Sequence, residues 1–327
     1  MIIPQYWAEA RRHRPRAAGQ GQVTIRRFGW SETSQAEAER MAAQRADEAL
    51  ARVVAGARLP RREPKVPYNG AAGVPIREEV LERIGKTVIT RNSYGAHCLN
   101  TPDVLFADID FDEGPGPGLV LAYVVVLLGG AALVALWYRS PWVFIPGVIA
   151  VLLFAHPLGV SVWTIRQRLR GGAEQAAFKR VRRFVARQPE WQLRLYRTPA
   201  GLRVLAMHRT FSATEPAVAA FFDALGVDRV YRQMCVNQDC FRARVGPKPW
   251  RVGVSGHIRP RPGVWPVAPE RMAERQAWIR HYESVAAGFA SCRFLEALGS
   301  GAAHPAAEAV RKIHDDRAQA LSGRDIA

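Results

Sequence analysis

The chain has 327 residues, a hydrophobic content of 48% and a formal net charge of +17. This length allows one domain with a sizeable core and additional membrane-spanning segments. The four cysteines, Cys98, Cys235, Cys240 and Cys292, are too few and too scattered for a disulfide-stapled secreted protein. Residues 1–16 also lack the small-residue cleavage site of an export signal, so we expect reduced thiols in a cytoplasmic compartment.

The first third of the chain alternates helical and strand-like patterns. Residues 21–30 predict a strand, and residues 34–55 predict a helix that starts with the capping-box pair Ser34 and Glu37. A proline- and glycine-rich connection follows over 56–75. Residues 76–85 then predict a short helix, and residues 86–111 predict two strand-like runs around a polar loop.

Two uncharged apolar segments follow, over residues 119–138 and 141–165. Each is long enough to cross a hydrocarbon layer of about 30 Å at 1.5 Å per residue. Only a short loop separates them, which predicts a transmembrane helical hairpin. The alternative is a buried hairpin in the core of a soluble protein.

The charges beside these segments predict an orientation. Seven Lys and Arg residues lie between Arg166 and Arg183, whereas the loop between the segments contains Arg139 alone. Basic flanks stay cytoplasmic, so we expect an inner (plasma) membrane protein of bacterial type with both termini in the cytoplasm. Residues 166–327 contain 28 basic and 14 acidic residues, which predicts a basic surface that attracts anionic lipid headgroups, with a nucleotide or nucleic acid as the alternative partner.

The segment after the apolar pair also mixes helices and strands. The predictions are an amphipathic helix over 174–188, a hairpin over 190–208, a helix over 215–226, a strand around 241–245, and helical stretches over 269–298 and 304–321. Strands therefore flank the apolar segments on both sides. This predicts one cytoplasmic α+β domain built from residues 1–117 and 166–327 and interrupted by the transmembrane hairpin at 118–165. Two separate domains are the alternative.

A pair of acids ends the last strand before the membrane. Side chains alternate along a strand, so Asp108 and Asp110 share one face. Two carboxylates side by side are a natural site for Mg²⁺ or Mn²⁺, although the sequence makes no cofactor certain. Alternatively, a basic neighbour offsets their charge, or both lie in a polar turn with Asp112 and Glu113.

Two later stretches contain residues that would complete such a site. A glycine-containing turn over 198–201 leads into a strand with Arg203 and His208. A third acid, Asp239, precedes a basic run. That run contains Arg242, Arg244 and Lys248. Alternation places Arg242 and Arg244 on one face, where they could bind phosphate.

This order of motifs resembles that of the archaeo-eukaryotic primase superfamily. The resemblance implies an RRM-like sheet and metal-dependent nucleotidyl transfer, with Asp108, Asp110 and Asp239 holding the metal ions. It further implies that Arg203 or His208, together with Lys248, contacts a triphosphate. The chain departs from the family pattern because Arg203 stands near the turn where the family has histidine.

Two further groups of residues contain possible metal-binding or catalytic side chains, but we expect them to have structural roles. Cys235 and Cys240, with His97 and Cys98, could form a zinc site, but their loose spacing favours buried thiols. A second group lies near the C-terminus, on a polar helix that we expect to be solvated. Its members are His304, His314, Asp315 and Asp316.

The sequence thus predicts a membrane-tethered binding or scaffolding module with a basic face. The alternative is a divalent-metal-dependent nucleotidyl-transfer or nucleotide-processing enzyme of primase-like fold. Whether Asp108, Asp110 and Asp239 converge distinguishes the two, because the enzyme needs all three carboxylates at one metal site.

Overall fold

The computed structural model describes residues 1–16, 21–60, 74–111, 114, 117–140, 142, 144–169 and 171–327. They group into two compact units. The first combines Met1–Ile109 with Phe184–Ala327, and the second is Asp110–Arg183. Most of the predicted connection over 56–75 lies outside the described residues, as do Asp112, Glu113 and Pro141. The mixture of helices and strands confirms the predicted α+β class.

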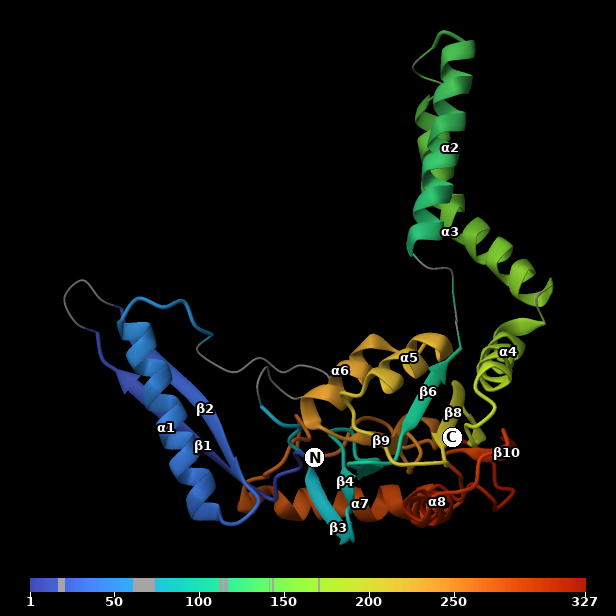
Figure 1. Cartoon of the computed structure of the whole chain (residues 1–327). Coiled ribbons are helices and arrows are strands. Elements are labelled where there is room, and N and C mark those ends of the chain that lie inside the picture. The colour runs from blue at the N-terminus through green and yellow to red at the C-terminus, as the bar shows by residue number, and fades with distance from the viewer. Residues whose placement is uncertain are drawn as a thin grey trace. The chain divides into compact units, whose positions relative to one another are not determined.

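The chain begins with a β-hairpin that one helix covers (Figure 1). Strands β1 (Tyr6–Arg14) and β2 (Val23–Ser31) pair antiparallel along their whole length. Helix α1 (Gln35–Val54) starts where the Ser34 hydroxyl accepts a hydrogen bond from the Glu37 N–H at 3.2 Å. The predicted strand and helix are confirmed here, whereas the sequence did not predict β1.

Helix α1 approaches the hairpin closely because the residues on both contacting surfaces have small side chains. Its buried residues are all alanine: Ala38, Ala42, Ala46 and Ala49. Opposite them stands Gly29 on β2. A Cβ atom at Gly29 would lie closer than 3.0 Å to the Ala38 carbonyl oxygen and to the Ala42 backbone.

Replacing Gly29 with alanine should therefore destabilise the protein by about 1–3 kcal/mol, because α1 has to move away from β2. Denaturant unfolding of the full chain in neutral detergent measures the change. Gly21→Ala is the matched control, since nothing lies within 4 Å of a Cβ there. Equal stabilities of the two variants would contradict the close approach.

One four-stranded sheet has the strand order β3-β4-β5-β9. Its strands are β3 (Glu79–Ile84), β4 (Thr87–Arg91), β5 (His97–Thr101) and β9 (Phe241–Arg244). The short helix predicted over 76–85 is wrong, because this segment is β3. It pairs with β4 across a tight turn in which Gly85 takes a φ of +57°, and this pairing outweighs local helix propensity.

A second sheet has the order β10-β7-β8-β6. Its strands are β6 (Phe106–Asp110), β7 (Leu193–Thr198), β8 (Gly201–Ala206) and β10 (Arg293–Leu298). The predicted hairpin is confirmed as β7 and β8. Strand β6 lies beside β8, so this sheet joins strands from both sides of the apolar helices. The helix predicted over 269–298 is wrong at its end, because residues 293–298 form β10 and pair with β7.

Four further α-helices lie within the described residues of the first unit. They are α5 (Pro216–Leu225), α6 (Arg229–Gln238), α7 (Met272–Ala286) and α8 (Pro305–Arg317). The sequence did not predict α6, which positions Tyr231 between the two sheets. The Tyr231 hydroxyl lies 3.1 Å from the Phe106 carbonyl oxygen of β6 and 2.9 Å from the Arg242 carbonyl oxygen of β9.

The second unit contains the apolar helices. Helices α2 (Pro117–Trp137) and α3 (Phe144–Leu169) lie side by side (Figure 1), with Gly147 against Ala131. Both are long and apolar enough to cross a membrane, over Val120–Trp137 and Phe144–Arg166. The amphipathic helix predicted over 174–188 is confirmed as α4 (Gly172–Arg187).

Candidate functional site

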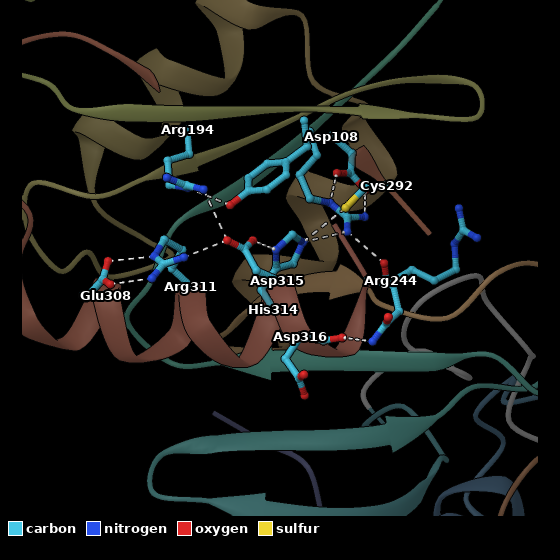
Figure 2. A network of polar contacts seen from close by, with 12 residues as sticks. Asp108, Arg194, Arg244, Cys292, Glu308, Arg311, His314, Asp315 and Asp316 are labelled. Atoms are coloured by element: carbon cyan, nitrogen blue, oxygen red, sulfur yellow. Dashed lines mark hydrogen bonds and ion pairs between the residues drawn. The ribbon is translucent and has the colours of Figure 1, made fainter. Parts of the chain in front are cut away.

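A network of polar side chains runs from Asp108 to Asp315 and Arg311 (Figure 2), and Arg203 connects Asp108 to the rest of it. Arg203 Nε and Nη2 on β8 donate to Asp108 Oδ1 and Oδ2 on β6, at 2.7 Å and 3.0 Å. Arg203 is 1% exposed, whereas the Asp108 side chain keeps 37% of its surface. A buried guanidinium needs a partner because its desolvation is costly. The charge of Asp108 is therefore offset by a basic neighbour.

His314 on α8 is the next member of the network, and its proton can be placed from its partners. Arg203 Nη1 donates to the Arg244 carbonyl oxygen at 2.8 Å and lies 3.3 Å from His314 Nε2. Arginine cannot accept, so Nε2 must accept and Nδ1 holds the proton. Nδ1 then donates to Asp315 Oδ1 at 3.0 Å.

The electrostatics of His314 agree with this neutral tautomer. Burial, together with the charge of Arg203, holds the pKa of His314 below its ordinary value, although Asp315 acts in the opposite direction. The imidazole therefore stays uncharged near neutral pH. It links Arg203 to Asp315 without adding a second positive charge to the interior.

Asp315 fixes the outer end of the network. Its Oδ2 accepts from Arg311 Nη1 at 2.8 Å and from Arg194 Nη2 at 3.3 Å. Burial alone would raise the pKa of Asp315, but hydrogen bonds from His314 and Tyr196 and the charge of Arg194 hold it below its ordinary value. Asp315 is thus a carboxylate, which completes a chain of alternating charges from β6 to α8.

Cys292, His314 and Asp315 have the order of a cysteine–histidine–aspartate triad. Cys292 Sγ lies 3.8 Å from His314 Nε2. Nε2 already accepts from Arg203, however, so it has no lone pair free to take the thiol proton. Burial raises the pKa of Cys292 to about 12, and the residue is 0% exposed. This arrangement supports a structural thiol and not a nucleophile.

The three predicted metal ligands have different surroundings. Asp108 contacts Arg203, and Asp110 is an exposed residue of the second unit. Asp239 ends α6 and accepts from the Met1 amino group at 3.0 Å. Among the described residues, no three His, Cys, Asp or Glu side chains form a group that could hold a metal ion. A role for Mg²⁺ or Mn²⁺ stays a prediction.

The candidate catalytic residues Arg203, His208 and Lys248 also lie in different environments. Arg203 is buried against Asp108, as described above. His208 follows β8, and its ring lies 4.6 Å from the ring of Trp191, where burial lowers its pKa. Lys248 Nζ lies 5.4 Å from the ring centroid of Trp250. Their catalytic roles stay predictions.

The two predicted phosphate-binding residues differ in exposure. Arg242 Nη2 donates to both carboxylate oxygens of Glu78 at 2.7 Å, and its Nη1 donates to Asn100 Oδ1 at 3.0 Å. Both Arg242 and Glu78 are buried. Arg244 is only half-buried and donates to the Gly246 carbonyl oxygen. Their binding of phosphate stays a prediction, and Arg242 would first have to leave Glu78.

Sequence reasoning missed the C-terminal part of the network. His314 and Asp315 were expected on a solvated helix, and that expectation is wrong, since they are 0% and 6% exposed. A signal was present in the spacing. Ala307, Val310 and His314 recur at intervals of three and four residues, which indicates one buried helix face.

Comparison with known proteins gives no family for the chain. No protein-family model, no curated protein and no solved structure matches it. The primase-like resemblance therefore stays a prediction that depends on the order of short motifs.

Proposed function

We propose that this protein is anchored in a membrane by α2 and α3 and that its first unit is a cytoplasmic, non-enzymatic binding or scaffolding module. One observation carries the proposal. None of the apolar window Val120–Trp137 of α2 is buried. An uncovered apolar surface of this size is unfavourable in water and favourable in a bilayer.

The orientation follows from charge. The basic segment after α3 favours a cytoplasmic position for both termini, with the loop near Ser140 outside. The first unit then lies on the cytoplasmic side, where its cysteines stay reduced. All four cysteines are free and buried.

A binding role is favoured because several groups that an enzyme could use are engaged in structural contacts. Asp108 is paired with Arg203, Arg242 with Glu78, and the Cys292 thiol is buried. Residues 166–327 contain 28 basic and 14 acidic residues, an excess of positive charge that suits an acidic partner.

A nucleotidyl-transfer enzyme is the second candidate. This candidate is supported by the order of motifs along the sequence and by strand β6, with Asp108 and Asp110, lying beside β8, with Arg203. This function would require Asp108 to exchange Arg203 for a metal ion.

Charges on the outer surface of α2 test the membrane anchor. Val126 and Leu133 are each 69% exposed. Changing both to arginine costs little if α2 is in water, but about 2.5–3.5 kcal/mol per residue at the centre of a bilayer. We expect the Val126→Arg, Leu133→Arg variant to leave the carbonate-resistant membrane fraction of cells.

Leu321→Arg is the matched control, because Leu321 is an exposed apolar residue of the first unit and the variant should stay in the membrane fraction. Reporter fusions at residues 110, 140 and 172 should report cytoplasm, outside and cytoplasm. If carbonate removed the unaltered chain from the membrane fraction, the proposed anchor would be refuted.

A further inference from the structure

Helix α4 presents a basic face. Lys179, Arg182, Arg183 and Arg187 are exposed and recur at intervals of three and four residues, which places them on one side of the helix. Ala177 and Val181, on another side, are 0% exposed. The only acidic residue of α4 is Glu174, in the first turn. The basic face therefore has no acid on its own helix beyond that turn.

This face follows the second apolar helix directly. Gly171 and Gly172 join α3 to α4 with φ values of +83° and +86°, which a residue with a Cβ rarely adopts. Lys179 lies 13 residues beyond Arg166, where the apolar window of α3 ends. Electrostatic attraction to a charged surface extends over about 8–10 Å at physiological salt. The basic face is therefore within reach of the headgroups if α3 crosses the bilayer and α4 runs along the membrane surface after the chain turns at Gly171 and Gly172.

We propose that Lys179, Arg182, Arg183 and Arg187 bind anionic lipid headgroups of the membrane that contains α2 and α3. This inference rests on the proposed membrane anchor. Arginine donates two parallel hydrogen bonds to a phosphate group, which suits three of the four positions. Each basic residue near an anionic surface changes binding by about fivefold.

A lipid fits this face better than a nucleic acid. The phenyl rings on α4, Phe178 and Phe184, are only partly exposed, and Phe184 packs against Trp191 and Phe221. The face thus offers charge without an open ring on which bases could stack. Its covalent connection to α3 further favours the bilayer itself as the ligand.

Ala186 provides a probe on the same face, because it is exposed and follows Arg182 by one turn. The full chain with Ala186→Cys is placed in nanodiscs of phosphatidylcholine, with or without phosphatidylglycerol, and labelled with an uncharged polyethylene glycol maleimide. The native cysteines are buried, so they react slowly. We expect phosphatidylglycerol to slow labelling by at least about fivefold, and high salt to restore it.

Two variants and one control position complete the test. Changing the four basic residues to glutamine should abolish the protection, whereas lysine at the three arginine positions should retain it. Ser255→Cys, an exposed site in the first unit near the basic residues Arg259 and Arg261, should label equally in both nanodiscs.

Equal labelling at Ala186→Cys in both nanodiscs would overturn the inference while leaving the anchor intact. Protection at Ser255→Cys alone would overturn it as well. If the chain failed to enter nanodiscs, the membrane anchor itself would be refuted.

Discussion

Replacing Asp108 with alanine is expected to lower the free energy of unfolding by about 3–5 kcal/mol. The change leaves the Arg203 guanidinium buried without the carboxylate that offsets its charge. Arg203→Met should cost less, because the Asp108 side chain is 37% exposed and can be hydrated when its partner is removed. Denaturant unfolding of the full chain in neutral detergent, followed by tryptophan fluorescence, measures both variants.

Asp223→Ala serves as the control for Asp108→Ala. Asp223 also pairs with an arginine, Arg232, but its side chain is 68% exposed, so its loss should cost at most about 1 kcal/mol. The metal hypothesis predicts a different result. If Mg²⁺ or Mn²⁺ raised the melting temperature of the unaltered chain, and Asp108→Ala lost that increase while staying folded, Asp108 would be a metal ligand and the enzyme proposal would gain support.

Replacing Glu78 with alanine should likewise lower the free energy of unfolding, by about 3 kcal/mol or more. Its carboxylate accepts from Arg242 and from the Thr90 hydroxyl inside the β3-β4-β5-β9 sheet. Glu78→Ala leaves Arg242 buried with only Asn100 as a side-chain acceptor among the contacts described above. The same unfolding measurement applies.

A double replacement separates a cost of unpaired charge from a cost of lost volume. Glu78→Leu combined with Arg242→Met removes both charges, and a buried ion pair exchanged for apolar side chains is often neutral in stability. We expect the double variant to be more stable than Glu78→Leu alone or Arg242→Met alone. Glu274→Ala, which breaks an exposed pair with Arg271, should change stability by less than about 1 kcal/mol. Strictly additive losses would contradict this account of the pair.

Sequence patterns predicted the elements whose signals are local. The β7–β8 hairpin has a turn sequence between two alternating runs, and α1 starts at a capping residue. Both signals depend on neighbouring residues only. The α+β class and the two apolar helices were predictable for the same reason.

Elements whose conformation depends on distant partners were not predictable. Residues 79–84 contain good helix formers, yet Glu79 receives hydrogen bonds from Arg275, almost two hundred residues away. Such tertiary contacts outweigh helix propensity in β3. Strand β10 likewise exists because β7 is available to pair with it.

The site was predictable only in part. Alternation along the strand placed Asp108 and Asp110 on one face and so raised the question of what offsets their charge, and a basic neighbour was one of the expected answers. Which of the many arginines supplies that charge depends on β8 lying beside β6. The sequence of neither strand indicates which other strand it will pair with. His314 was missed because a polar helix surface was assumed, although its spacing with Val310 indicates burial.

The position of β6 beside β8 also sets an order of events during synthesis. About 90 residues separate Asp110 from Gly201, so at 5–20 residues per second a ribosome needs roughly 5–18 s to deliver the second strand after the first. Throughout this interval the nascent β6 has no strand to pair with on its β8 side, while the apolar helices leave the ribosome. If the two apolar helices enter a membrane as proposed, their insertion precedes completion of the sheet, and the edge of β6 stays open to aggregation or to capture by a chaperone until β8 has been made.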